Sequence, residues 1–322
     1  MLSSILTASR MNAMHKPARS YEACRFNSTR VNASILTSLS VGIFVLLALL
    51  AVTGMGLAFE FAKFALIALS LFALAGYCYF RKLSWRLADC ANAFAFATIS
   101  LMVCGLVSCI GLRAGFPLAD SLLYRTDTLI GFDTPKIVQF VAARPLVSQL
   151  LYFAYNSSGP LCIALALWLL FQKDRVRFWG IVVTLVVSMQ IIGVVSILFP
   201  ARGGAISLGL DALQGNGLPV GSGTYFANAF SHFYYGTDPI VMLKDMQGVV
   251  AFPSFHTVMA LVVMQACSAS GLRWPALAWS VLTIVSTIPM GGHYVVDLAA
   301  GFIVWLAAVR LAAWSTMADA KQ

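Results

Sequence analysis

Two short stretches of the sequence each place a histidine where an apolar run begins. In AFPSFHTVMALV, residues 251–262, His256 directly precedes a segment that is long enough to cross a bilayer. In GGHYVVDLAAG, residues 291–301, His293 and Asp297 stand at the start of another apolar run. Ionisable side chains at the mouth of a membrane span are costly, and they are kept where they have a function. These two stretches are therefore the first candidates for a site.

The spacing of His293 and Asp297 suits a histidine that reacts. Four residues apart on a helix, the two side chains share a face, so the carboxylate can accept a hydrogen bond from one ring nitrogen and leave the other free. The aspartate would also raise the basicity of the ring and stabilise its charged form. Taken alone, the His293–Asp297 motif could also be a purely structural pair. His256 taken alone could also be a capped residue at the membrane interface.

Residues that commonly bind anions stand beside both histidines. Pro253 suits the first turn of a helix, and Ser254 together with the free N–H groups at that helix start forms an anion site. Gly291 and Gly292 let the backbone before His293 approach a ligand closely. Brought together, these groups predict phosphoryl chemistry, in which one imidazole attacks phosphorus and the other protonates the leaving oxygen. A metal site is the weaker interpretation, because a fourth ligand in motif spacing is missing.

The elements that position these residues must lie in a membrane. Of the 322 residues, 60% are hydrophobic and only 10% are charged, whereas soluble domains carry about 25% charged residues. The composition therefore predicts an all-α, polytopic helical membrane protein. The net charge of +9 comes from short basic clusters between apolar runs, which is how topology is encoded, so we exclude a nucleic-acid partner. The cysteines follow no disulfide or zinc pattern.

Apolar runs of about 17 to 25 residues predict about eight transmembrane helices. Alternate threading of these runs puts nearly every dense basic cluster on one face, which the positive-inside rule makes cytoplasmic. Both histidine motifs then lie at outer helix ends and at the same depth. We therefore expect a multi-pass protein of the cell inner membrane with its site facing the outer, periplasmic side. The expected spans are 36–58, 64–80, 89–112, 147–171, 179–199, 254–271, 275–291 and 295–314.

The spans divide the chain into five parts. A polar, basic cytoplasmic tail precedes the N-terminal transmembrane helices, and interfacial helices follow on the outer face, where apolar residues recur at helical spacing with charges between them. A transmembrane core then carries both histidine motifs, and a glycine-rich stretch within it, 200–252, predicts a flexible outer loop. The boundaries, in the same order, are 1–34, 35–112, 113–146, 147–315 and a final tail at 316–322.

The two histidine motifs resemble those of the type 2 phosphatidic acid phosphatase superfamily, which also includes vanadium haloperoxidases. The residues PSFH at 253–256 match its second motif, Pro-Ser-x-His, and HYVVD at 293–297 matches the His-x-x-x-Asp that ends its third. The resemblance implies a phosphatase-type helical core in the last part of the chain and a phosphohistidine formed on His293. It also implies that His256 is the acid for the leaving group and that Asp297 orients the nucleophile.

The sequence departs from the family pattern at two places. The first motif, a lysine followed by Arg-Pro, is not in place. Lys136 and Arg144-Pro145 imitate it, but the spacing is one residue too long and a full transmembrane excursion intervenes, so we treat the likeness as coincidence. The Ser-Arg that opens the third motif is Ser286-Thr287 here, so a phosphate-holding arginine is missing.

The transition state still needs partners for its phosphate oxygens. By resemblance, Ser254 binds one of them, and Gly292 lets the backbone come close. Arg202 and Lys244 are the two basic residues of the outer loop, and both flank the expected site in the sequence, so they are the candidate cations. Ordinary loop charges are the alternative for each of them.

The bulky residue within Pro-Ser-x-His, the missing arginine and the stretch PLADSLLYRTDTLIGFD look closest to the inositol phosphorylceramide synthase-like (inositolphosphotransferase) branch. We expect a metal-independent enzyme without a cofactor that hydrolyses a lipid phosphoester at the outer leaflet. Its substrate would be a phospholipid or an isoprenyl phosphate. Hydrolysis is preferred because water needs no second binding site, and headgroup transfer to a lipid or polyol is the alternative. A transporter is the alternative outside enzymology, but it would place its polar groups near the midplane.

Overall fold

The computed structural model describes residues 28–317, so most of the expected N-terminal tail, 1–27, and the last residues of the C-terminal tail, 318–322, lie outside the described residues. Within the described range the chain is helical except for connecting loops and one short parallel pairing. In that pairing, β1 (Gly56–Leu57) lies beside β2 (Ile240–Val241). The all-α membrane architecture predicted from the composition is therefore confirmed.

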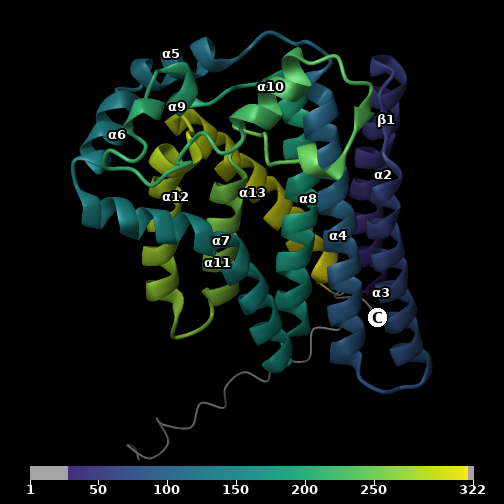
Figure 1. Ribbon diagram of the computed structural model, residues 1–322. Helices are drawn as coiled ribbons and strands as arrows, with labels where there is room; N and C mark the ends of the chain where they lie inside the picture. The colour runs from purple at the N-terminus through teal and green to yellow at the C-terminus, as the bar shows by residue number, and fades with distance from the viewer. Residues whose placement is uncertain (1–27, 318–322) are drawn as a thin grey trace, which may run out of the picture.

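Seven helices of the described range are long and apolar enough to cross a membrane, which makes this a multi-pass membrane protein. With the shorter helix Phe255–Cys267 between the fifth and sixth of them, they are joined in alternation, so successive helices run antiparallel (Figure 1). The spanning helices are α2 (Ser28–Thr53), α3 (Ala62–Phe80), α4 (Trp85–Leu112), α7 (Pro145–Phe171), α8 (Arg175–Leu198), α12 (Arg273–Gly291) and α13 (Val295–Thr316).

The remaining expected span, 254–271, is a shorter helix, α11 (Phe255–Cys267). Its 13 residues reach only about 20 Å, less than the ~30 Å thickness of a bilayer's hydrocarbon core. The helix stops early because the hydroxyls of Ser268 and Ser270 bond to the last carbonyls, those of Gln265 and Cys267. Since α11 is packed among α7, α8, α12 and α13, it does not need to span on its own.

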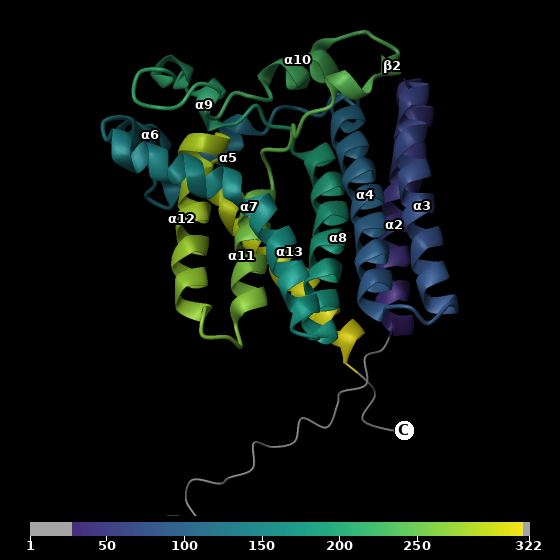
Figure 2. The same cartoon turned by 60° about the horizontal axis from the view of Figure 1, so that its bottom comes forward.

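The helices form two groups with their short connecting elements gathered at one end (Figures 1 and 2). Helices α2, α3 and α4 lie on one side, and α7, α8 and α11–α13 lie on the other. We call the end that carries the short helices the loop end, and the opposite end the basic end, because Lys82, Arg86, Lys173, Arg177 and Arg273 lie in its turns. The short helices are α5 (Asp120–Leu129), α6 (Thr134–Ala142), α9 (Gly204–Ser207) and α10 (Ala227–Tyr235).

Residues 200–252 differ from the flexible loop that their glycines predict. The segment contains α9 and α10 and two 3-10 turns, Asp211–Leu213 and Leu243–Asp245. Its aromatic side chains, Phe226, Phe230 and Phe233, are buried against the end of α4. The glycines alone predict flexibility, but burial of these large aromatic rings stabilises the segment in one conformation.

Helix α7 bends in its middle, so that its first half crosses the tops of its neighbours and its second half descends between them (Figures 1 and 2). Pro160 lies inside this helix and lacks the N–H that would bond to the preceding turn, which is a common cause of such a bend. The bend turns the buried face of α7, including Tyr155, toward the start of α11.

Candidate active site

His293 lies in the turn between α12 and α13. Helix α12 ends at Gly291, and Gly292 follows in the left-handed conformation at a φ of 71°, as is common after a helix end. The backbone N–H of His293 donates to the carbonyl of Thr287 at 3.2 Å. The side chain is only 2% exposed. His293 therefore precedes α13. The sequence had predicted that it shares a helix face with Asp297, and the structure differs from that prediction.

The contact between His293 and Asp297 forms nevertheless, because Asp297 occupies the first turn of α13 and its carboxylate faces back. Oδ2 of Asp297 lies 3.2 Å from Nδ1 of His293 and accepts the backbone N–H of Tyr294 at 2.9 Å. Asp297 is fully buried. The carboxylate therefore fixes Nδ1 as the protonated ring nitrogen and leaves Nε2 with a free lone pair.

Ser254 lies beside that free nitrogen. It is the N-cap of α11, where its Oγ accepts the N–H of Thr257 and lies 3.4 Å from Nε2 of His293. Its backbone N–H donates to the carbonyl of Asp297 at 3.1 Å, so the starts of α11 and α13 are tied together. Pro253 precedes this cap instead of occupying the first turn. The N-terminus of α11, with its unpaired N–H groups, is thus aimed at the histidine.

His256 lies in the first turn of α11 and is half-buried. Its ring is stacked on that of Tyr155 from α7, with 3.9 Å between the ring centroids. A methyl group added at Gly291 would meet both the Tyr155 ring at 3.0 Å and the His293 ring at 2.8 Å, so both rings pack against the end of α12. The two histidines are close enough to interact electrostatically.

Tyr155 is held by a second tyrosine from the loop end. Its hydroxyl lies 3.2 Å from that of Tyr225, which is part of the 200–252 segment. Burial raises the pKa of Tyr225, so this hydroxyl keeps its proton. Neither tyrosine is recognisable in the sequence, because tyrosines in apolar surroundings carry no motif, and only the turn at the loop end brings Tyr225 to α7.

Glycines from three segments meet at the turn that carries His293. The N–H of Gly204 donates to the carbonyl of Gly292, and the N–H of Gly223 donates to that of Met290, both at 2.6 Å. A Cβ on Gly203 would lie 2.7 Å from the Gly292 carbonyl oxygen. Side chains are excluded at these contacts, so the outer segment is fastened to the turn backbone to backbone. We call this contact the glycine clasp.

Two buried aspartates of α5 hold the other side of the turn. Asp127 accepts the N–H groups of Val295 and Val296 at 2.8 and 2.9 Å, which are the first of α13. Asp120 accepts the hydroxyl of Tyr294 at 3.2 Å and the N–H of Arg202 at 2.9 Å. Carboxylates at a helix N-terminus are stabilising. In the sequence, Asp120 and Asp127 are two acidic residues seven apart in an amphipathic run, and this spacing places them on one helix face.

The two candidate cations have different surroundings. Arg202 lies next to the glycine clasp, and its Nε is buried without a hydrogen-bond partner among the residues described. Lys244 is exposed and lies beside β2, where the neighbouring Leu243 N–H donates to Glu60 near the start of α3. Figure 2 shows β2 above α3 and α4, away from α9 and α12. The structure thus brings Arg202 to the site and does not bring Lys244 there.

The residues that imitate or replace the family's other cations are occupied elsewhere. Lys136 is paired with Asp133 at 2.8 Å, and its side chain is 81% exposed. The hydrogen bond from Lys136 lowers the pKa of Asp133. Arg144 is stacked on Phe140, with its guanidinium carbon 3.6 Å from the ring centroid. Thr287, at the position of the missing arginine, is fully buried and its hydroxyl donates to the carbonyl of Ile284 in its own helix, so no charge stands there.

Fold and site together define a multi-pass membrane protein with a buried histidine beside a helix N-terminus. The chain belongs to the PAP2 superfamily, whose family model matches residues 121–311, more than half of the chain. This confirms the resemblance to the type 2 phosphatidic acid phosphatases and makes the protein a phosphatase- or phosphotransferase-type enzyme of lipids. Neither the curated proteins nor the solved structures gave a match to this chain. The matched region begins in α5 and leaves out α2, α3 and α4.

Proposed function

We propose that the protein hydrolyses a lipid phosphoester through a phosphohistidine on His293. The observation that carries this proposal is the position of Nε2 of His293, which has Asp297 behind the ring and Ser254 at the start of α11 in front of it. A nucleophile fixed in one tautomer and facing a helix N-terminus is suited to attack on a phosphate.

In the first step, Nε2 of His293 attacks phosphorus, a P–N bond forms, and the P–O bond to the lipid breaks. His256, protonated, gives its proton to the leaving oxygen. Asp297 remains ionised and stabilises the positive charge that develops on the ring. In the second step, His256 takes a proton from water, the oxygen attacks phosphorus, and the P–N bond breaks to restore His293 and release phosphate.

The phosphate oxygens are assigned to three groups. The hydroxyl of Ser254 and the free N–H groups of the first turn of α11 donate hydrogen bonds to the phosphate oxygens from one side. Arg202 supplies a cation from the other side, because its buried Nε is unpartnered among the described residues. Gly292 leaves space near the phosphate and donates no hydrogen bond to it, since its N–H is bonded to Thr287.

The site is assigned to the outer leaflet of the cell inner membrane. The loop end carries the site, and the basic end carries the clustered Lys and Arg residues, which the positive-inside rule puts in the cytoplasm. The substrate is a phospholipid or an isoprenyl phosphate that reaches the site from the membrane. Reaction at an outer surface also suits a mechanism in which histidine and cationic groups do what a metal ion would otherwise do.

Phosphate release from detergent-solubilised lipids tests the proposal. The panel contains phosphatidate, an isoprenyl pyrophosphate and a lysophospholipid, each measured with EDTA for the wild type and for His293→Ala. We expect release that survives EDTA and is lost in the variant. Release that stops with EDTA contradicts metal independence. Headgroup exchange that appears only when a second lipid or alcohol is added replaces hydrolysis with transfer, and silence under both conditions contradicts the enzyme assignment.

A further inference from the structure

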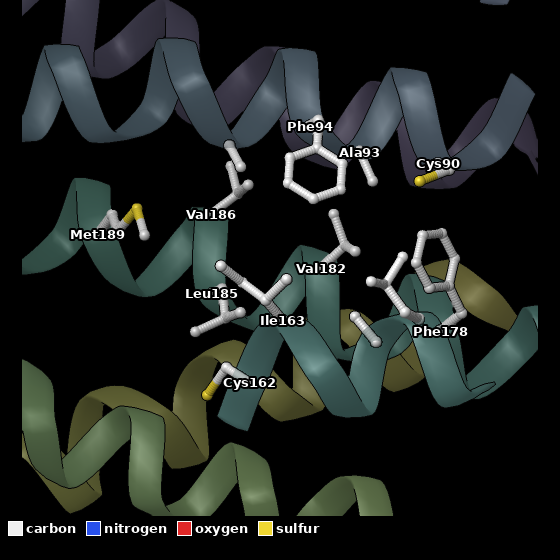
Figure 3. A pocket seen from close by; sticks show the side chains of 13 residues that line it. Cys90, Ala93, Phe94, Cys162, Ile163, Phe178, Val182, Leu185, Val186 and Met189 are labelled. Carbon is white, nitrogen blue, oxygen red and sulfur yellow. The ribbon is translucent and has the colours of Figure 1, made fainter. Parts of the chain in front are cut away.

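A crevice lined wholly by apolar side chains lies between α4, α7 and α8 (Figure 3). Phe94 extends into it from α4, Cys162 and Ile163 from α7, and Val182 and Met189 from α8. Every lining group is hydrocarbon or sulfur, so water gains no hydrogen bond there. The crevice lies within membrane-spanning helices, where the bilayer supplies hydrocarbon chains to fill it.

The crevice begins one helical turn from the candidate active site. Tyr155 of α7 is stacked on His256, and Cys162, seven residues further along the same face, contacts the carbonyl of Met259 with its sulfur at 3.5 Å. Met259 is three residues past His256 on α11. The buried face of α7 therefore runs from the site directly to the lining of the crevice.

Gly159 leaves the way between site and crevice open. It precedes Ile163 by one turn of α7, so both lie on the face toward the crevice. A Cβ placed on Gly159 would meet no atom of the described residues within 4 Å. A hydrocarbon chain that leaves the site along α7 thus meets no side chain at this position.

The far end of the crevice lies within reach of a lipid chain that starts at the site. On α11, His256 is ten residues from Ala266, whose carbonyl lies 3.5 Å from a guanidinium nitrogen of Arg177, and Phe178 beside Arg177 lines the crevice near the basic end. Ten helical residues rise by about 15 Å. A hydrocarbon chain of about that length that starts at the site therefore ends where the crevice ends.

We propose that this crevice binds one hydrocarbon chain of the lipid whose phosphate reacts at His293, and that α4 forms the wall that selects it. The inference rests on the proposed function and names the substrate class as a lipid with acyl chains about 15 Å long. Because α4 lies outside the region that matches the family model, this specificity belongs to the N-terminal helices of this chain.

Filling the crevice tests the proposal by activity. Ala97 of α4 lines the crevice, and Ala97→Phe puts a ring into it. We expect KM for dipalmitoyl phosphatidate to rise at least about tenfold, since losing two buried CH₂ groups already accounts for that factor. KM for dioctanoyl phosphatidate and kcat for both lipids should stay within about twofold. Ala73→Phe on the exposed side of α3 is the matched control. Equal effects on both chain lengths, or no effect on either, overturn the proposal.

Photolabelling separates the chain site from the reaction. Phosphatidate with a diazirine at the end of a palmitoyl chain is photolysed with His293→Ala, which binds but does not turn over. We expect labelled peptides within 90–97, 162–167 or 178–189, and loss of that label with Ala97→Phe and with Gly159→Leu. Label elsewhere, or no label, overturns the chain site even where phosphate release is established. Label here without phosphate release from the wild type leaves the chain site standing and removes the proposed reaction.

Discussion

At the scale of single residues, the two oxygens of the Asp297 carboxylate have different surroundings. Oδ2 is shared by the His293 ring and the Tyr294 N–H, whereas Oδ1 is buried without a hydrogen-bond partner in the described part of the chain. Leaving a buried acceptor unpaired costs about 1–3 kcal/mol. We therefore infer that this carboxylate is kept for its charge, which faces the ring that becomes positive in the proposed reaction.

Replacing that charge tests its role. Asp297→Asn keeps the size of the side chain but removes the charge and allows the wrong His293 tautomer. We expect kcat for phosphate release to drop by on the order of 10³ to 10⁴, as the corresponding change does in a serine-protease triad. Asp133→Asn removes a carboxylate from an exposed pair on the loop end and is the control. A loss below tenfold in Asp297→Asn would mean that the carboxylate only supports the turn.

The two candidate cations make a matched pair for the second prediction. Arg202→Gln removes a guanidinium beside the glycine clasp, and Lys244→Gln removes an exposed ammonium above α3 and α4. We expect kcat/KM to decrease about 10²-fold for Arg202→Gln, the usual cost of one donor to a developing oxyanion. For Lys244→Gln we expect a change within about twofold. Comparable losses in both variants would show that Lys244 reaches the substrate from its loop.

At the scale of the elements, three segments that are distant in the sequence converge on the three-residue turn before α13. Asp127 of α5 accepts the first N–H groups of α13, and Ser254 at the start of α11 is bonded to the first turn of α13. The glycine clasp covers the turn from the outer segment. No single contact is strong, but each fixes the backbone on a different side. Precise placement of a nucleophile depends on such support, since misplacement by about 1 Å costs roughly 10²-fold in rate.

The glycine clasp gives a prediction with an internal control. Gly203 and Gly209 both have positive φ, 82° and 65°, but only Gly203 is packed against the turn, 2.7 Å from the Gly292 carbonyl when given a Cβ. Alanine at Gly209 costs about 1 kcal/mol of conformational strain. At Gly203, where φ is 82° and ψ is 158°, it costs about 1–3 kcal/mol, because that region is open essentially to glycine alone. We expect both variants to lower the thermal stability, Gly203→Ala more, and only Gly203→Ala to reduce kcat, by about tenfold or more. Equal kcat in the two variants would show that the clasp does not position His293.

The sequence predicted the spans better than it predicted the site's surroundings. Expected and observed helices agree closely, as for 89–112 and α4 (Trp85–Leu112), because apolar runs bounded by charges are local signals. The early end of α11 was missed because the apolar run continues through its last turn. The contact of Asp297 with His293 was predicted from spacing, although its geometry depends on a turn. Tyr155 and Asp127 were missed because only tertiary packing brings them to His293.

At the scale of the whole molecule, the distribution of charge and of the short helices gives the protein two unlike ends. Loops at the basic end are short, with Lys or Arg in each loop or directly beside it, whereas the loop end carries α5, α6, α9 and α10 and the buried site. The N-terminal helices pack on α8 through both α2 and α4, so they belong to the same bundle although the family match omits them. In this arrangement the basic end sets orientation, the loop end carries the chemistry, and the apolar crevice lies between the two.

The orientation is tested by labelling single cysteines with a membrane-impermeant maleimide. Cys24, outside the described residues, is first replaced by serine, and the other cysteines lie within the membrane helices. Leu129→Cys presents an 86% exposed position at the end of α5, and Gln172→Cys presents an exposed one between α7 and α8. Because basic loops stay in the cytoplasm, we expect Leu129→Cys to react in intact cells and Gln172→Cys only after permeabilisation. The reverse pattern would place His293 at the inner surface, and the substrate would then have to be a lipid of the cytoplasmic leaflet.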